Sequence, residues 1–226
     1  MRFRKIKHLE ARRNKCEELR IDCPLPDFDL RNLDEHYSPI DLKKVFKNNN
    51  PLVLEIGCGK GQFACEYAKQ NPDKNIIGIE CVPGVLVKAC EKAKEAELQN
   101  LRFLEMKAEY LSIFIEKNSV SEIYLNFSTP FPKYKQRKHR LTSPEFLKIY
   151  KQILIPNGFI VQKTDSAVLF EFSIESFSQN GFELGEVTLD LHNSRIEGNI
   201  ETEYEQRFLA EGLPIYRLKA SLKKSS

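Results

Sequence analysis

The segment Leu54-Glu55-Ile56-Gly57-Cys58-Gly59-Lys60-Gly61-Gln62-Phe63 decides how this chain folds. Its first residues continue an apolar run that is typical of a buried strand, and residues 61–72 have the spacing of a helix that ends at a proline. The alternate glycines between them let the backbone turn sharply and let a ligand approach the main chain at the start of the helix. The segment therefore predicts a strand, a turn and a helix, with a ligand site at the turn.

Acidic residues near the turn separate two classes of ligand. A dinucleotide-binding turn would carry glycine where this chain has Gln62. Glu55 lies two residues before the first glycine, where its carboxylate would repel a pyrophosphate and attract a cation. Glu80 ends the next predicted strand, a position from which a carboxylate can accept hydrogen bonds from both hydroxyls of a ribose. The pattern indicates a positively charged nucleoside as the ligand. A glycine turn that binds nothing is the structural alternative.

Strand and helix patterns alternate through the rest of the chain. Strands are predicted over residues 51–57, 75–80, 101–106, 121–127, 158–164, 182–191 and 214–222. Helices are predicted over residues 61–72, 83–98, 108–117, 143–154, 167–180 and 202–212. Such alternation predicts an α/β fold with a mostly parallel sheet and helices on both faces, and the last two strands predict a late hairpin. We expect a single domain over residues 51–226 and a basic, partly flexible N-terminal arm and lead-in over residues 1–50.

Positive charge is concentrated in two segments of this chain, whose 226 residues have a formal net charge of only +3. Residues 1–15 hold seven Lys/Arg and one acid, and residues 133–140 hold five Lys/Arg and no acid, so the remainder is acidic. Clusters of Lys and Arg are typical of proteins that bind a polyanion such as a nucleic acid. A solvated surface is the plainer interpretation of such a cluster.

The sequence lacks the patterns of membrane, exported and metal-binding proteins. No apolar run approaches the roughly 18–20 residues that a bilayer requires, and the basic N-terminus has no apolar stretch behind it. The six cysteines form no CxxC pair and no Cys/His cluster, which argues against a zinc site or a disulfide framework. We therefore expect a cytoplasmic protein with no membrane partner and no bound metal.

The loop after the predicted strand 121–127 is a second candidate site. In open parallel sheets, ligands bind beyond the carboxyl ends of the strands, so residues 128–133 should border a second substrate. The basic run follows directly on this loop and could hold nucleic-acid phosphates while a base enters the site. The candidates for these phosphate contacts are Lys135, Arg137, Lys138 and Arg140.

Polar motifs later in the chain supply further carboxylates. Asp165 follows a predicted strand, which is a site position, although the same residue could cap the helix predicted over 167–180. Thr202 and Glu205 could contact a substrate, and they also have the spacing of a helix capping box. A role in capping does not exclude one in binding.

The glycine turn with Glu55 and Glu80 resembles that of the class I methyltransferases, which bind S-adenosylmethionine. This resemblance implies a Rossmann-like fold, with a seven-stranded, mostly parallel sheet and an antiparallel C-terminal strand. More specific motifs resemble the bacterial tRNA (guanine-N7)-methyltransferases over most of residues 51–217. These motifs are EIGCGKGQF (55–63), IGIE (77–80), YLNFSTPFPK (124–133), RL-T (140–142), KTD (163–165), LHNS (191–194) and EGNIETEYE (197–205). The resemblance implies methyl transfer from S-adenosylmethionine to N7 of the variable-loop guanine of tRNA, at position 46. The sequence leaves both a monomer and a homodimer open.

The family resemblance also implies roles for individual residues. The methyl donor would be bound by Glu55, Gly57, Gly59, Gly61, Glu80, Lys107 and Thr129. The substrate would be contacted by Lys133, Asp165, Thr202, Glu203, Tyr204 and Glu205. Asp165 and Thr129 would be the catalytic residues, with Thr129 standing where the family usually has aspartate.

Departures from the family pattern leave two alternatives open. Phe131 stands where the family usually has tryptophan, and Lys107 where it usually has an acid that Glu109 could replace. Residues 128–131 loosely resemble the substrate loop of amino-group methyltransferases, which would act on another nucleic-acid substrate. Thr129 and Lys107 also leave open a non-catalytic RNA-binding module with the methyltransferase fold.

Overall fold

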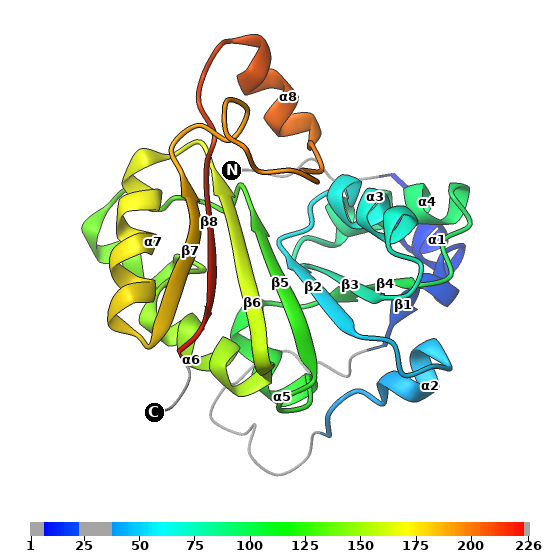
Figure 1. Cartoon of the computed structure of the whole chain (residues 1–226). Helices are drawn as coiled ribbons and strands as arrows, with labels where there is room; N and C mark the ends of the chain where they lie inside the picture. Colours follow the sequence, from blue (N-terminus) through cyan, green and yellow to red (C-terminus); the bar gives the residue numbers. More distant parts are fainter. Residues whose placement is uncertain (1–6, 23–37, 224–226) are drawn as a thin grey trace.

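One sheet runs through the whole fold, with its strands in the order β1-β4-β3-β2-β5-β6-β8-β7 (Figure 1). The computed structural model describes residues 7–22 and 38–223, and in these ranges the sheet has eight strands. They are β1 (Arg20–Ile21), β2 (Leu52–Ile56), β3 (Asn75–Glu80), β4 (Leu101–Glu105), β5 (Val120–Asn126), β6 (Leu154–Thr164), β7 (Phe182–Thr188) and β8 (Tyr216–Leu222). β8 runs antiparallel to both of its neighbours, and the other neighbouring strands pair in parallel.

The mostly parallel sheet, the late hairpin and the antiparallel C-terminal strand are thereby confirmed. The prediction of seven strands is one too few, because it does not include β1. This strand is only two residues long, so it leaves no alternating pattern in the sequence. β1 pairs in parallel with β4 and extends the sheet at that edge.

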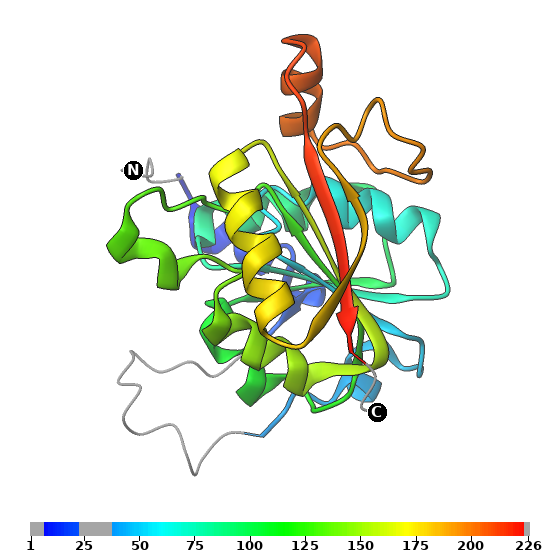
Figure 2. The same ribbon diagram turned by 60° about the vertical axis from the view of Figure 1, so that its left-hand side comes forward.

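Helices cover both faces of the sheet, and α7 lies across one of them (Figure 2). The α-helices are α1 (Leu9–Asn14), α2 (Leu42–Phe46), α3 (Gln62–Gln70), α4 (Pro83–Glu95), α5 (Leu111–Phe114), α6 (Pro144–Ile153), α7 (Ala167–Gln179) and α8 (Glu203–Ala210). Short 3-10 helices are η1 (Glu17–Leu19), η3 (Ala108–Tyr110) and η4 (Tyr134–His139). The helix predicted over 108–117 is therefore split into η3 and α5 and ends early.

The alternation of side chains along β2 explains the two hydrophobic cores. Leu54 and Ile56 point to the face covered by α5, α6 and α7, whereas Val53 points to the face covered by α3 and α4. Each fully buried side chain of this size contributes roughly 1.5–3 kcal/mol to folding. Glu55 is the one charged residue in this buried strand, so its position there needs a reason other than stability.

The N-terminal segment is bound to the domain where the structure describes it. α1 packs against α4, and Arg12 Nε donates a hydrogen bond to Glu91 at 2.6 Å. Arg13 pairs with Glu105 at 3.0 Å. These contacts neutralise two positive charges of the predicted arm. Residues 1–6 and 23–37 lie outside the described residues, so the flexibility of the arm and lead-in stays a prediction.

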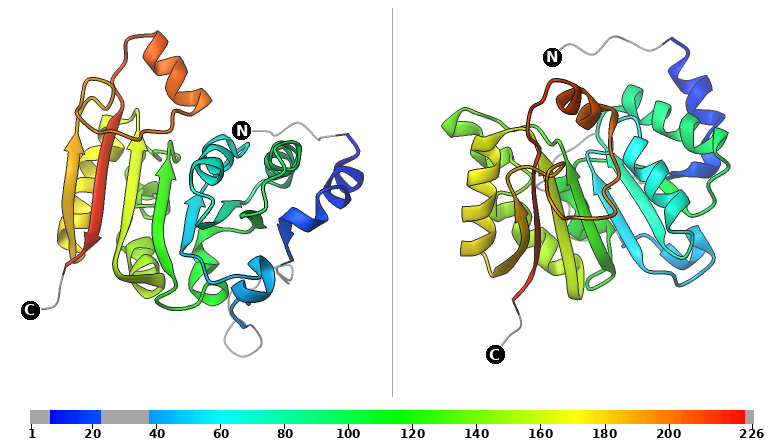
Figure 3. Two further views of the ribbon diagram at one scale, coloured as in Figure 1. Left: turned by 45° about the vertical axis from the view of Figure 1, so that its right-hand side comes forward. Right: turned by 45° about the horizontal axis from the view of Figure 1, so that its top comes forward.

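The carboxyl ends of the parallel strands meet at one edge of the sheet. The segment between β7 and β8, which contains α8, lies beyond this edge (Figure 3). The turn after β2, the loop after β5 and the motif after β6 open at the same edge. The topology therefore gathers at one place the segments that the sequence marks as candidate sites.

Candidate active site

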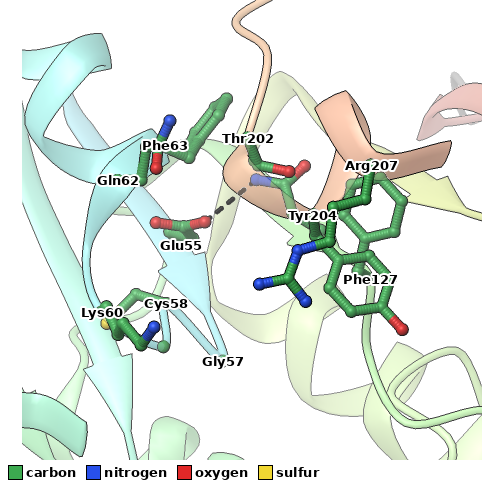
Figure 4. Close-up of a pocket in the computed structure, with 12 residues that line it drawn as sticks. Glu55, Gly57, Cys58, Lys60, Gln62, Phe63, Phe127, Thr202, Tyr204 and Arg207 are labelled. Carbon is green, nitrogen blue, oxygen red and sulfur yellow. Dashed lines mark hydrogen bonds between the residues drawn. The ribbon is translucent and has the colours of Figure 1, made fainter. Parts of the chain in front are cut away.

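A cavity of about 280 Å³ opens at the carboxyl ends of β2 and β5 (Figure 4). Its walls come from the glycine turn, the start of α3, the end of β5 and the start of α8. Among the lining residues are Glu55, Gly57, Gly59, Asn126, Thr202 and Tyr204. The glycine turn and the TEYE motif, which are far apart in the sequence, thus form one site.

The three glycines of the turn have different tasks. Gly57 and Gly59 have φ angles of 78° and 56°, and a Cβ at either position would meet no atom within 4 Å. Gly61 has φ 74°, and a Cβ there would lie 2.7 Å from the Cβ of Ala89 in α4. Gly57 and Gly59 therefore keep space open at the cavity, whereas Gly61 permits the close packing of α3 on α4 and does not line the cavity.

Glu55 is the buried acid of the cavity. It is 3% exposed, and its Oε1 accepts a hydrogen bond from Asn126 Nδ2 at 3.0 Å (Figure 4). Burial raises the pKa of Glu55 to about 7, although the Asn126 hydrogen bond and the positive charge of Lys163 act to lower it. Among the described residues, Glu55 Oε2 and Asn126 Oδ1 are buried without a hydrogen-bond partner. Two unpaired acceptor oxygens suit a ligand that brings N–H donors and positive charge.

Glu80 ends β3 beside the glycine turn, as predicted. Its Oε2 accepts a hydrogen bond from Gly59 N at 3.2 Å, and its Oε1 accepts one from Val82 N at 3.0 Å. The carboxylate therefore fixes the shape of the turn, and its contact with a ribose stays a prediction. Lys107 and Glu109 follow β4, and both are exposed outside the cavity lining, so the role given to Lys107 also stays a prediction.

Arg140 holds the loop after β5, and its prediction as a phosphate contact is wrong. The side chain is fully buried, with Nε donating to Pro130 O at 2.9 Å and Nη2 donating to Phe131 O at 3.1 Å. Its guanidinium also lies 4.6 Å from the ring centre of Phe172 in α7. Phe127 and Phe131 both have positive φ angles, of 51° and 42°, which are rare for aromatic residues. Arg140 thus stabilises a strained loop instead of binding an external anion.

Three residues predicted to contact the methyl donor or the substrate are exposed beyond the ends of β5 and β6. Thr129 and Lys133 belong to the loop after β5, and Asp165 follows β6 directly. Ser166, and not Asp165, caps α7 by accepting a hydrogen bond from Leu169 N. In the part of the chain that the structure describes, the Asp165 carboxylate has no hydrogen-bond or ion-pair partner. It is therefore available to a ligand at this edge of the sheet.

Thr202 and Tyr204 bring the start of α8 to the cavity. Thr202 Oγ1 accepts a hydrogen bond from Glu205 N at 3.1 Å, so the capping role predicted for Thr202 is confirmed. The ring centre of Tyr204 lies 5.1 Å from that of Phe127, which closes the cavity on one side (Figure 4). The side chain of Glu203 lies outside the described residues, so its predicted role stays a prediction.

Glu205 is not exposed to a substrate, so the substrate contact predicted for this residue is wrong. The side chain is fully buried, and its Oε2 accepts a hydrogen bond from Lys163 Nζ at 2.7 Å. Its Oε1 accepts a hydrogen bond from Asn199 Nδ2 at 2.6 Å. The carboxylate is therefore saturated by partners inside the protein and has no surface to offer a substrate.

The basic run forms η4, beside the loop that borders the cavity. Lys135, Arg137 and Lys138 are exposed on it, as contacts with phosphate require. Tyr134 is 78% exposed on the same helix, and the guanidinium of Arg137 lies 4.8 Å from its ring centre. Exposed cations next to an exposed aromatic ring are typical of surfaces that bind unpaired nucleic acid.

Sequence reasoning assigned no role to Asn126, Phe127 and Lys163. Each belongs to a motif quoted above, but the roles were given to their neighbours. A polar residue inside an apolar strand pattern is the signal that could have indicated Asn126 and Lys163. Phe127 carries no such signal, because its left-handed backbone is visible only in the structure.

Other kinds of site are not found in the described residues. In residues 7–22 and 38–223, no group of three or more His, Cys, Asp or Glu could hold a metal ion. Within the same ranges no helix combines the length and the apolar character that crossing a membrane requires. The described cysteines are free thiols, and Cys23 lies outside the described residues.

The strand order and the acid-flanked glycine turn together define a class I methyltransferase. The solved structure of the 16S rRNA methyltransferase KamB has this fold, with a TM-score of 0.62 and 17% identity over 84% of this chain and 96% of that one. A family model described as "Putative methyltransferase" matches residues 49–218.

Two relatives are named tRNA (guanine-N(7)-)-methyltransferase. The relative from Listeria innocua serovar 6a is 47% identical over 96% of this chain and 97% of its own length. The relative from Bacillus subtilis is 49% identical over 84% of this chain and 92% of its own length. The chain belongs to the tRNA (guanine-N7)-methyltransferase family, which confirms the resemblance seen in the sequence.

Proposed function

We propose that this protein transfers a methyl group from S-adenosylmethionine to N7 of a guanine in tRNA, and that this guanine is at position 46 of the variable loop. The observation that supports it most is the 47% identity, over 96% of the chain, with a relative named for this activity. The cavity adds support, because an acid with an unpaired oxygen faces the space kept open by Gly57 and Gly59. The substrate lies in the cytoplasm, where we expect the enzyme to act.

The residues of the cavity fit the proposed methyl donor. Glu55 and Asn126 offer acceptors for its ammonium group. Glu80, beside the glycine turn, is the acid that we expect to bind the hydroxyls of its ribose. Lys60 and Arg207 are exposed at the same cavity and suit its carboxylate. S-adenosylmethionine, when bound, supplies an electrophilic methyl group, and its transfer to N7 leaves positive charge on the guanine ring.

The acceptor side needs no general base, because guanine N7 has a lone pair and no proton. The protein has to align the reacting atoms and exclude water. Phe127 and Tyr204 supply the apolar wall for this, and Arg140 keeps the acceptor loop in its shape. Asp165 is placed to stabilise the growing positive charge, since its carboxylate is exposed and unpaired among the described residues.

The direct test is transfer of a labelled methyl group to unmodified tRNA, followed by identification of the methylated nucleoside and of its position. We expect 7-methylguanosine at position 46. A methylated exocyclic amino group would instead support the amino-group methyltransferase. Binding of tRNA with neither transfer nor donor binding would support the non-catalytic module.

The affinity for S-adenosylmethionine should fall as the pH falls below about 7. Burial raises the pKa of Glu55 to about 7, so the carboxyl group becomes neutral below that pH and no longer attracts a cation. Isothermal calorimetry from pH 7.5 to 5.5 should show a dissociation constant that rises by up to about tenfold per pH unit. The Glu55→Gln variant should bind weakly at every pH, with a nearly flat profile. A flat profile for the wild type would contradict the assignment of Glu55.

Replacing Lys135, Arg137 and Lys138 by alanine should weaken tRNA binding and reduce its salt dependence. Each lost phosphate contact removes the release of about one counterion, so the slope of log K against log salt should fall by roughly two to three. A matched control replaces Lys43, Lys44 and Lys47, which are exposed around α2 at the opposite edge of the sheet. Equal slopes for the two triple variants would show that the η4 surface does not bind tRNA.

A further inference from the structure

The ammonium group of Lys163 lies at the centre of a buried polar cluster that the proposed reaction does not use. Its Nζ donates hydrogen bonds to Asn199 Oδ1 at 3.0 Å, to Ile200 O at 2.8 Å and to Glu205 Oε2 at 2.7 Å. An ammonium group has three N–H donors, so all of them are used. The cluster therefore ties the end of β6 to the segment that leads into α8.

Glu205, the charged partner of Lys163, is as completely buried as the ammonium itself. The side chains of Lys163 and Glu205 are 3% and 0% exposed. His192 Nε2 lies 3.7 Å from Glu205 Oε1 and has no hydrogen-bond partner in the described residues. Burial of an ion pair costs about as much as the pair gains, so stability alone does not account for this arrangement.

Lys163 is also an electrostatic neighbour of the donor cavity. Its Cα pairs in register with that of Asn126, the residue that donates a hydrogen bond to Glu55. Its Nζ lies 5.7 Å from the ring centre of Phe63, which lines the cavity. The charges of Lys163 and Glu55 influence each other's pKa, the ammonium acting to lower that of the acid.

The charges of three buried groups contribute to what the cavity attracts. Glu55 and Glu205 each bring one negative charge when ionised, and Lys163 brings one positive charge. Because Lys163 is bound to Glu205, Glu55 remains a buried acid beside the cavity with no ion-pair partner among the described residues. Without the Glu205 carboxylate, the ammonium would be compensated by Glu55 instead, and the cavity would lose its attraction for a cation.

We propose that Glu205 is a positioning residue which sets the charge of the donor cavity, by holding the Lys163 ammonium in a closed pair so that Glu55 is left for the cationic methyl donor. The same pair fixes the start of α8, and with it Thr202 and Tyr204, at the cavity wall. This inference rests on the proposed function, since it takes S-adenosylmethionine as the ligand. It gives Glu205 a role in binding the donor and not the guanine.

The test compares two ligands that differ by the sulfonium charge. S-adenosylmethionine carries one more positive charge than S-adenosylhomocysteine, and their shape is nearly the same. Isothermal calorimetry without tRNA gives the ratio of the two affinities for the wild type, Glu205→Gln and Lys163→Met/Glu205→Gln. Glutamine keeps the size of Glu205 and an oxygen that can accept from Lys163, so the single variant removes the charge and, with it, the acceptor for Asn199 Nδ2.

Glu205→Gln should shift the ratio against the charged donor by about tenfold or more. The double variant removes one charge of each sign and should restore the ratio to within about twofold of the wild type. Glu122→Gln is the matched control, because Glu122 is a buried acid 2.7 Å from Lys74 and does not line the donor cavity. This control should leave the ratio unchanged. A shift that occurs in Glu205→Gln and not in Glu122→Gln would therefore not come from a general loss of stability.

Three outcomes would overturn the inference. One is a Glu205→Gln protein that has the wild-type ratio and a reduced transfer rate, since Glu205 would then act on the acceptor. Another is a double variant whose ratio stays shifted, and this comparison decides the matter even where Glu205→Gln fails to fold. The third is a wild-type protein that binds neither ligand. This outcome would also refute the proposed function, whereas the first two would refute only the role of Glu205.

Discussion

An Asp165→Asn enzyme is expected to transfer methyl groups roughly 30- to 1,000-fold more slowly than the wild type, with little change in its affinity for S-adenosylmethionine. The carboxylate follows β6 at the edge where the cavity opens, and it has no partner among the described residues. Positive charge grows on the guanine ring during transfer, so a carboxylate beside the ring binds the transition state better than the ground state. One such electrostatic group is worth on the order of 2–4 kcal/mol.

Single-turnover rates with saturating donor and tRNA measure this effect, because they isolate the transfer step from product release. Asp73→Asn is a suitable control, since Asp73 is exposed in the turn before β3, away from the carboxyl ends of the strands. The control should keep the wild-type rate. An Asp165→Asn enzyme within about twofold of the wild type would leave catalysis to alignment and to other residues.

The fold could be predicted because both signals that determine it are local. Residues 51–57 carry an apolar run without a break other than Glu55, and the glycine turn follows at once. Every predicted strand is present, and the predicted hairpin is formed by β7 and β8. The sequence does not predict β1, because its two residues are paired with residues of β4 that lie far away in the sequence, and no local pattern records such a pairing.

The sequence predicts which residue types lie near the site, but not which of them are exposed to a ligand. Glu55, Gly57 and Gly59 line one cavity, as residues at a strand end should, and their contact with the methyl donor stays a prediction. Arg140 and Glu205 were assigned as contacts with tRNA, yet both are fully buried. A charged residue in a polar motif looks the same in the sequence whether its partner is water, a ligand or the protein, because burial depends on contacts between distant segments.

Lys163→Met is expected to lower the free energy of unfolding by about 3–5 kcal/mol. The substitution keeps an unbranched side chain of similar length, but it leaves Glu205 fully buried without the ammonium group that pairs with it. An unpaired buried charge has lost its water and gains nothing in return. Urea denaturation should show a lower midpoint with an unchanged slope, since the slope reports the surface exposed on unfolding. Lys163→Met/Glu205→Gln should recover most of the loss.

The Lys94→Met variant tests whether the loss of stability in Lys163→Met comes from burial of the ion pair or from its short distance. Lys94 and Glu18 lie 2.7 Å apart, the same separation as Lys163 and Glu205, but their side chains are 49% and 57% exposed. Water screens an exposed pair and solvates either partner alone, so this variant should lose much less stability than Lys163→Met. Equal losses for the two methionine variants would mean that the Lys163 pair is solvated and that α8 does not cover it in solution. A large loss for Lys163→Met alone would establish that α8 is held to β6 by a charge shielded from water.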